Sequence, residues 1–212
     1  MMAYLRDPQA IEAESFRLIR AGIAGKSFTP LERAVVERVI HATADFSYAE
    51  DLRFSPGVVE HALGALKRGC ALVTDTRMAK AGVNPRLCGA LGLEVRCALE
   101  YEGVEVLARR KKVTRAMASM MLVAEQERDA IFLVGNAPTA LFALVELFWE
   151  GKTQASLVIG VPVGLVGAEE AKKALRATSL PSITTVGPRG GTPVAVAILH
   201  ALLKLAVGES HG

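Results

Sequence analysis

Cysteine is scarce in this sequence, and its placement argues against two kinds of scaffold. The three cysteines, Cys70, Cys88 and Cys97, are odd in number, lie in apolar surroundings and form no CxxC pair. Disulfide-dependent folds and structural zinc sites both need paired cysteines or paired metal ligands. We therefore expect neither scaffold, and this cysteine usage suits a reducing cytosol.

Long apolar runs and an excess of one charge are also missing. Acidic residues interrupt segment 1–16 where a signal peptide would be apolar, and no run of eighteen uncharged apolar residues follows. The 25 lysines and arginines nearly balance the 22 aspartates and glutamates, so no global positive field attracts nucleic acid. We expect a cytoplasmic protein without membrane or nucleic-acid partners, in which local groups hold any anionic ligand.

Motifs for nucleotides and catalytic metals are absent as well. Neither GxGxxG nor GxxxxGK[ST] occurs, so a nucleotide would lack its usual phosphate loop. No two of the four histidines have i, i+4 or HxH spacing, and no carboxylate-rich cluster compensates. We predict no cofactor and no catalytic metal.

The sequence does contain an alternation of helical segments with short apolar runs. Two helices are expected at 8–23 and 30–44, the second opening on Thr29 and Pro30 with Glu32 at N3. Later apolar runs lie at 70–75, 93–99, 130–135, 155–161 and 182–187, with helical segments at 55–67, 114–128, 138–150, 167–178 and 192–206. Continuous apolar character is typical of strands buried on both faces of a parallel sheet.

This order predicts a single domain over 1–212, in which the two helices at 8–44 lead into a three-layer α/β/α fold with about five mainly parallel strands. The ligand site is expected at the carboxyl ends of the strands, where the loops at 75–82, 135–138, 162–167 and 187–192 meet. Segment 98–110 is less defined, because its Glu102-Gly103 pair between alternating valines also fits a hairpin.

His41 is the histidine best placed for chemistry. It lies with Ala34 and Arg38 to one side of the apolar stripe of its helix, which consists of Leu31, Val35, Val39 and Ala42. In the last helical turn, the helix dipole is expected to stabilise the imidazolium by roughly 0.3 to 1 kcal/mol and so favour a proton donor. From the residues alone a plain surface histidine is the stronger alternative, and His61, His200 and His211 are better explained structurally.

Arginines near helix ends are the candidate anion-binding groups. Arg115 follows a possible Thr114 cap at a helix start, where its guanidinium and backbone N–H groups together suit a carboxylate. Arg20, beside Ser15 at the end of the first helix, is a second candidate, with an ordinary surface arginine as an equal alternative. The basic run at 109–112 is interpreted as a solvated loop.

Two glycine-bearing turns, GNAPTAL at 135–141 and GPRGGTPVA at 187–195, each lead from a strand into a helix. Their glycines and prolines suit tight turns. The exposed N–H groups expected at both helix starts also suit anionic ligand groups.

Seven segments together resemble the precorrin-8X and cobalt-precorrin-8 methylmutases. They are ESFRLIR at 14–20, RVIHATADF at 38–46, TDTRMAKAGV at 74–83, VTRAMA at 113–118, GNAPTAL at 135–141, GVPVGLVGAEEAK at 160–172 and RGGTPVAVA at 189–197. The similarity is collinear and spans nearly the whole chain. GNAPTAL and GVPVGLVGA are its most specific pair.

The resemblance implies a flavodoxin-like sheet, a homodimer with sites near the subunit interface, and an isomerase of cobalamin biosynthesis. The implied reaction shifts a methyl group from C11 to C12 of a corrinoid precursor, giving hydrogenobyrinate or cobyrinate without an external methyl donor. His41 is then the catalytic acid. The predicted substrate-binding positions are Ser15, Arg20, Asp75, Arg115, Asn136, Gly190 and Gly191.

Alternatives remain open at this level. The family has a metal-free branch and a cobalt branch, and HATADFSYAEDLRFSP at 41–56 looks more like the cobalt branch, where cobalt arrives inside the substrate. A carrier that binds a corrinoid without converting it is one rival function. A nucleotide-dependent enzyme on the same fold is another, although the missing phosphate loop counts against it.

Overall fold

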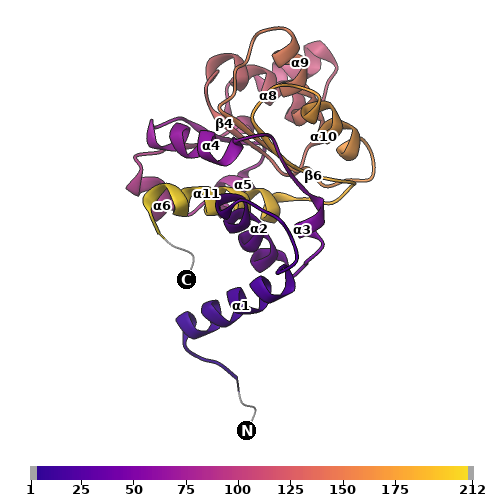
Figure 1. Cartoon of the computed structure of the whole chain (residues 1–212). Coiled ribbons are helices and arrows are strands. Elements are labelled where there is room, and N and C mark those ends of the chain that lie inside the picture. The colour runs from indigo at the N-terminus through magenta and orange to yellow at the C-terminus, as the bar shows by residue number, and fades with distance from the viewer. Residues whose placement is uncertain (1–3, 210–212) are drawn as a thin grey trace.

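One six-stranded sheet organises the computed structural model, which describes residues 4–209 (Figure 1). In spatial order the strands are β1, β6, β5, β4, β2 and β3. Their bounds are β1 Leu52–Phe54, β2 Leu72–Thr74, β3 Val95–Cys97, β4 Ile131–Val134, β5 Leu157–Gly160 and β6 Ser182–Thr185. Strands β2 to β6 pair in parallel, and in chain order they are arranged 2-1-3-4-5, the flavodoxin-like pattern. The predicted fold class and its five strands are confirmed.

The edge strand β1 is an element that the sequence did not predict. It pairs antiparallel with β6, with Leu52 opposite Thr185 and Phe54 opposite Ile183. Three residues, LRF, are too short to show a period, so only the tertiary pairing defines this strand. An antiparallel edge on an otherwise parallel sheet is common.

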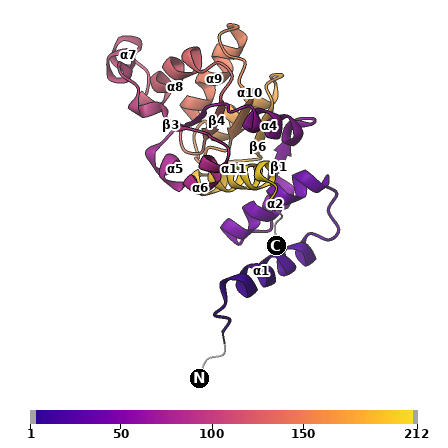
Figure 2. The ribbon, with the colours of Figure 1, turned by 90° about the vertical axis from the view of Figure 1, so that its left-hand side faces the viewer.

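Helices cover both faces of the sheet (Figure 2). One face carries α4 (Val58–Lys67) and α11 (Thr192–Val207), with the short α5 (Arg77–Gly82) and α6 (Pro85–Ala90) packed on α11. The other face carries α8 (Arg115–Gln126), α9 (Pro138–Trp149) and α10 (Ala168–Arg176). No helix within residues 4–209 combines the length and the apolar content needed to cross a membrane.

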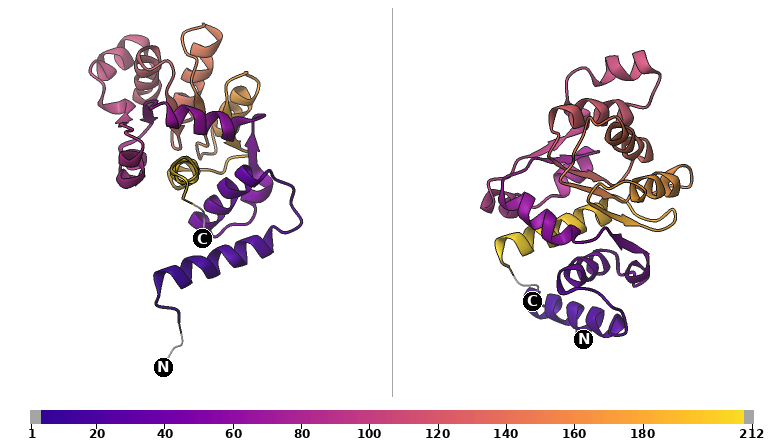
Figure 3. Two further views of the ribbon diagram at one scale, coloured as in Figure 1. Left: turned by 60° about the vertical axis from the view of Figure 1, so that its left-hand side comes forward. Right: turned by 45° about the horizontal axis from the view of Figure 1, so that its top comes forward.

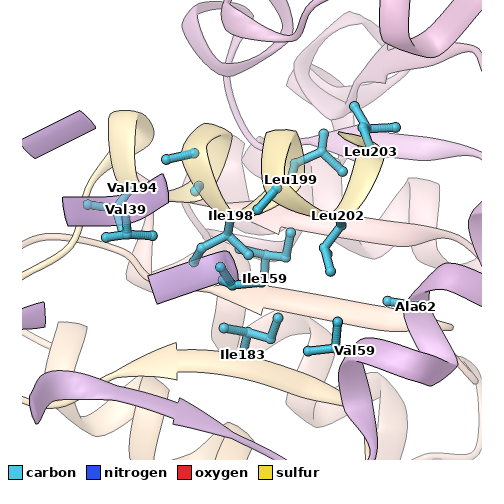
Figure 4. Packing of buried hydrophobic residues seen from close by; sticks show 14 of the residues in the cluster. Val39, Val59, Ala62, Ile159, Ile183, Val194, Ile198, Leu199, Leu202 and Leu203 are labelled. Atoms are coloured by element: carbon cyan, nitrogen blue, oxygen red, sulfur yellow. The ribbon is translucent and has the colours of Figure 1, made fainter. Parts of the chain in front are cut away.

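Alternation along the strands fills both layers of the core. In β4, Ile131 and Leu133 join the cluster beneath α11, whereas Phe132 and Val134 join the cluster beneath α8 to α10. On the α11 side, Ile159 and Ile183 of the sheet face Ile198 of α11 (Figure 4). Each such fully buried aliphatic side chain contributes about 1.5 to 3 kcal/mol relative to exposure.

The two predicted N-terminal helices are present and form further layers outside α11 (Figure 3). Helix α2 (Pro30–Thr43) packs on α11, and α1 (Pro8–Gly22) packs on α2. The predicted capping box is confirmed: Thr29 Oγ1 accepts from Glu32 N at 3.2 Å and Thr29 N donates to Glu32 Oε2 at 3.0 Å. Because α2 is covered on two sides, its buried surface is wider than the predicted stripe.

The apolar stripe predicted for α2 is not buried at its C-terminal end. Val36 and Ile40 are buried beside Val35 and Val39, whereas Ala42 is exposed. Covering by α1 explains the additional buried residues, which a single-sided helical wheel does not predict.

The hairpin considered for segment 98–110 does not form. The segment folds into a short 3-10 helix, η1 (Ala98–Glu100), and then into α7 (Val104–Lys111). Gly103 begins α7 with a φ of +86°, and Val104, Leu107 and Ala108 are buried at i, i+3 and i+4. The short helix α3 (Tyr48–Asp51) was likewise not predicted.

Candidate functional site

The carboxyl ends of the parallel strands bring four loops to one edge of the sheet, as predicted. The loop after β6 contacts the loop after β5, since Gly191 N donates to Val161 O at 2.8 Å and Gly164 N donates to Pro188 O at 3.0 Å. Strand β2 lies between β3 and β4, so the topological switch point is the boundary between β2 and β4. Asp75 stands there, directly after β2.

Asp75 is used to hold the start of α9. Its side chain is 1% exposed, and its Oδ2 accepts from Asn136 N at 2.7 Å and from Ala137 N at 3.0 Å. Burial raises the pKa of this carboxyl, while the hydrogen bonds from the backbone of Asn136 and Ala137 oppose the rise. These two N–H groups are therefore not free for an anionic ligand, which corrects the expectation from the sequence.

Asp75 and Asn136 nevertheless differ in access. Asp75 Oδ1 is buried and has no hydrogen-bond partner among the described residues, whereas Asn136 is exposed at the edge of the sheet. Asn136 can thus reach a ligand directly. A substrate role for Asp75 stays a prediction, whereas its hydrogen bonds to Asn136 N and Ala137 N support a role in positioning the start of α9.

Gly190 and Gly191 have a packing reason to be glycine. Gly190 has a φ of +153°, and a Cβ placed on it would lie 2.1 Å from Val161 O. Gly191 adopts a φ of +120° and begins α11 without a side-chain cap. The loop 187–191 is therefore pressed against the end of β5, and it presents the start of α11 at the sheet edge.

His41 lies in the last turn of α2, facing α1. Its ring stacks on Phe16, with 5.0 Å between ring centroids and 1° between planes. A surface depression of about 210 Å³ surrounds it, lined by Ser15, Leu18, Ile19, Ile40, His41, Ala44 and Phe46. Ser15 and His41, two of the residues predicted for the site, thus line the same depression.

The surroundings of His41 lower the pKa of its imidazole. Partial burial is the largest cause, Arg38 adds a repulsive positive charge, and Lys204 acts in the same direction. Glu12 opposes them. The helix-end argument predicted a stabilised imidazolium, and that direction is wrong for the chain by itself, because burial and the charges of Arg38 and Lys204 lower the pKa of His41.

Arg20 adjoins this group but already has partners. Its Nε donates to Glu37 Oε2 at 3.2 Å, and its guanidinium lies 5.8 Å from the centroid of the Phe16 ring. The Glu37 side chain is nearly fully buried, so Arg20 compensates a buried charge. A substrate contact by Arg20 would have to share the guanidinium with Glu37.

Arg115 stands at the sheet edge but on the opposite layer from His41. The predicted Thr114 cap is confirmed, since Met117 N donates to Thr114 Oγ1 at 3.1 Å. Thr114 Oγ1 also lies 2.7 Å from Thr139 Oγ1 in the first turn of α9, which places Arg115 near the GNAPTAL turn. Arg115 pairs with Glu105 at 2.6 Å, and both side chains are more than half exposed.

His200 and His61 lie apart from the site residues predicted from the sequence. His200 Nε2 accepts from Asn84 N at 3.0 Å, a structural role as predicted, and His61 is exposed on α4. His211 lies outside the described residues. Within residues 4–209 no group of three or more histidine, cysteine or acidic side chains is arranged to hold a metal ion.

The predicted residues therefore form two groups in one chain. The helix group contains Ser15, Arg20 and His41, and the sheet-edge group contains Asp75, Arg115, Asn136, Gly190 and Gly191. Sequence reasoning gave no role to two residues that connect these regions, Lys172 and Arg189. A signal for Lys172 was present, because it falls on the buried stripe of α10 with Ala168, Ala171 and Leu175.

The strand order and the loops at the sheet edge define a flavodoxin-like α/β protein, a fold in which ligands generally bind at the switch point. Residues 10–205 match the family model for precorrin-8X methylmutase. The chain belongs to the precorrin-8X methylmutase family. The predicted enzyme class, an isomerase of cobalamin biosynthesis, is confirmed at the level of this family.

Individual relatives agree with the family over almost the full chain. The cobalt-precorrin-8 methylmutase of Salmonella typhimurium is 42% identical, covering 95% of this chain and 97% of the relative. That of Methanothermobacter thermautotrophicus is 46% identical, covering 85% and 84%. The crystal structure of precorrin-8X methylmutase from Thermus thermophilus superposes with a TM-score of 0.86 at 43% identity, covering 94% of this chain and 98% of that one.

Proposed function

We propose that this chain shifts a methyl group from C11 to C12 of precorrin-8X or cobalt-precorrin-8, giving hydrogenobyrinate or cobyrinate, with His41 as the acid. The observation that carries the assignment of the acid is the position of His41 in a surface depression beside Ser15, with one ring face supported by Phe16. Stacking holds the imidazole in one plane and leaves its nitrogen edges to meet a ligand.

Protonation is the chemistry that such a histidine supplies. A proton placed on a conjugated imine-type nitrogen draws electron density from the adjoining ring and lowers the barrier to methyl migration. The migrating group stays within one molecule, so the reaction needs no external methyl donor. The protein then has to bind the ring, orient it and deliver the proton.

Recognition of a ring that carries many carboxylates fits scattered cationic groups better than one strong field. Arg20 and Arg115 each combine a guanidinium with a helix end, and Asn136 is exposed next to Asp75 at the switch point. Charge-assisted contacts at such positions are worth roughly 1.5 to 3 kcal/mol each. These residues are the proposed substrate-binding set together with Ser15, Gly190 and Gly191.

The active unit in this proposal is a homodimer. The depression of about 210 Å³ at His41 is small for a drug-sized ligand, for which pockets of roughly 300 to 1,000 Å³ are usual. Leu18 and Phe46 at its rim are about half exposed, and Arg115 stands on the opposite layer. A second copy that contributes its sheet-edge group would enclose the ligand and cover these apolar side chains.

For the metal state, we propose the cobalt-bearing substrate. The support is the name cobalt-precorrin-8 methylmutase carried by the relatives at 42% and 46% identity. The cobalt ion belongs to the substrate in this assignment. Turnover of purified enzyme with cobalt-precorrin-8 and with precorrin-8X, compared by kcat/KM, tests it, and a preference for the metal-free ring would reject it.

Replacement of the acid tests the function directly. His41→Ala should lose about 10²- to 10⁴-fold in kcat while still binding the corrinoid, since only proton donation is removed. The matched control is His61→Ala, which removes an exposed histidine from α4 and should retain full turnover. Near-normal turnover by His41→Ala would reject the assignment.

A label on the migrating methyl separates an isomerase from a carrier. Enzyme dialysed free of nucleotide and methyl donor should convert substrate that carries isotope-labelled methyl at C11 into product with all of the label at C12. A carrier would shift the visible absorption of the corrinoid without forming the rearranged acid. Dilution of the label by an added unlabelled donor would contradict the intramolecular shift.

A further inference from the structure

Lys172 is a fully buried lysine that the proposed chemistry does not use. It lies on α10 with an exposure of 0%, among the small and apolar residues of the helix face that packs on the sheet. Its Nζ donates to two neutral oxygens, Thr185 Oγ1 at 3.0 Å and Arg189 O at 2.7 Å. Burying an ammonium group is costly, and these two hydrogen bonds offset part of that cost.

Lys172 is hydrogen-bonded to the backbone of the loop after β6. Arg189 O accepts from Lys172 Nζ and also from Thr185 Oγ1 at 2.7 Å. The next residue, Gly190, is pressed on Val161 from the other side. The carbonyl of Arg189 is therefore fixed between α10 and the end of β5.

The side chain of Arg189 extends this anchor toward α2. Its guanidinium pairs with Asp45, donates to Ser47 and reaches Asp51 Oδ2 at 3.2 Å. It also lies 4.9 Å from the centroid of the Tyr48 ring. The guanidinium thus contacts segment 45–51. This segment begins two residues after the end of α2, and the last turn of α2 carries His41.

We infer that Lys172 is a positioning residue for His41: through Arg189 it fixes segment 45–51, and with it the end of α2, relative to the edge of the sheet. This inference rests on the proposed function, because it takes His41 as the proton donor. Lys172 itself does not contact the substrate, since it is enclosed by α10, β6 and loop 187–191. Its effect is expected on the rate of the chemical step, where small displacements of the acid are costly.

The first experiment compares two adjacent lysines of α10 in the full-length enzyme. Lys172→Met keeps roughly the length of the side chain and removes the ammonium group, whereas the control Lys173→Met removes an exposed lysine that pairs with Glu169. Lys172→Met should lose about 10- to 100-fold in kcat with little change in KM, because placement of the acid is disturbed and binding groups are intact. Lys173→Met should behave as wild type, and a normal kcat in folded Lys172→Met would overturn the inference.

A second variant acts at the surface end of the same chain of contacts. Asp45 is about 39% exposed at its side chain, so Asp45→Asn removes one charged partner of Arg189 without opening a cavity in the core. It should lower kcat in the same direction, and combined with Lys172→Met it should add little further loss, since both changes interrupt one connection. Losses in kcat that multiply would overturn the inference, and if Lys172→Met fails to fold, an unchanged kcat in Asp45→Asn overturns it alone.

The outcome for His41→Ala separates failure of the inference from failure of the proposed function. If His41→Ala loses turnover while Lys172→Met and Asp45→Asn keep a normal kcat, only the positioning role is wrong. If His41→Ala retains turnover, the acid is misassigned and the positioning role falls with it.

Discussion

At the scale of single residues, the lowered pKa of His41 has a direct consequence for pH dependence. An acid must be protonated to act, so kcat/KM should fall as the pH rises through the pKa of His41 in the free enzyme, by about tenfold per pH unit beyond it. Because burial and nearby cations lower that pKa, the decline should begin below pH 6.5. Bound carboxylates raise the pKa of an imidazole, so kcat should decline at a higher pH than kcat/KM.

Charge variants identify the group behind this decline. Lys204→Gln removes a cation that lowers the pKa of His41, so the decline of kcat/KM should move to higher pH. Lys67→Gln, which removes an exposed charge at the end of α4, should leave the profile unchanged. A kcat/KM profile that is flat well above pH 6.5 in the wild type would show that His41 is not the titrating acid.

Lys172 offers a second prediction, on stability. Burial and the charge of Arg176 lower its pKa from 10.5 to about 8, while Glu169 and Asp51 oppose the shift. Between these two pH values the unfolded chain binds the proton and the folded chain does not, so the free energy of unfolding should rise with pH across this window, by up to a few kcal/mol. Below pH 8 both states are protonated and this contribution is constant.

Urea unfolding at pH values from 7 to 10 measures the effect by comparison with Lys172→Met, which cannot titrate at this position. The difference in unfolding free energy between wild type and variant should shift in favour of the wild type as the pH rises. A difference that is independent of pH would mean that the buried amine keeps an ordinary pKa.

The sequence predicted where His41 lies but not its pKa. Its place beside the apolar stripe follows from the helical period, whereas the pKa depends on Phe16, Arg38 and Lys204, which reach it from α1, α2 and α11. Lys172 was detectable as a cation on a buried helical face, although its hydrogen-bond partners were not. Local sequence patterns do not predict contacts between elements that are distant in the sequence.

At the scale of elements, the long and continuous signals were predicted well. The five parallel strands follow from apolar runs between helical segments, and Thr29 with Glu32 located the start of α2. The three-residue β1 and the short helices α3, α5 and α6 carry too few residues to show a period. Segment 98–110 was ambiguous because Gly103 suits both a hairpin turn and the start of α7, and burial of Val104 and Leu107 decides between them.

The loop after β6 allows a prediction that separates backbone strain from a steric clash. Gly187 and Gly190 both have positive φ, but a Cβ on Gly187 meets nothing within 4 Å, whereas one on Gly190 would lie 2.1 Å from Val161 O. Gly187→Ala should therefore cost about 1 kcal/mol of unfolding free energy from conformation alone. Gly190→Ala should cost several kcal/mol, since the clash adds to the strain.

Thermal or urea unfolding of the two alanine variants checks this contrast. The Gly190 variant should also lose turnover, because displacement of the loop moves Arg189 and disturbs its ion pair with Asp45 in segment 45–51. Equal destabilisation of the two variants would show that the loop can move away from β5 without cost.

At the scale of the whole molecule, the helix group and the sheet-edge group lie apart within one chain, and this separation bears on the proposed homodimer. His41 faces α1 on the outer side of α2, while Arg115 begins α8 on the opposite face of the sheet (Figure 1). Arg189 connects the segment after α2 to the loop after β6, whereas Arg115 pairs within residues 4–209 with Glu105 of α7, away from the helix group. In the proposed homodimer, a second copy brings both residues to one substrate.

Mixing two defective variants tests that assembly. In a dimer with shared sites, a hybrid of His41→Ala and Arg115→Ala chains has one site with both defects and one site with neither. Random exchange makes half of the dimers hybrids, so the mixture should regain about a quarter of wild-type kcat/KM under subsaturating substrate, although each variant alone is impaired. If each site is built within a single chain, every hybrid site still carries one defect, and mixing should restore nothing beyond the average of the two variants. Recovery that depends on time and on total protein concentration, as subunit exchange requires, would then identify the homodimer as the unit that assembles the acid and the arginine around one corrinoid.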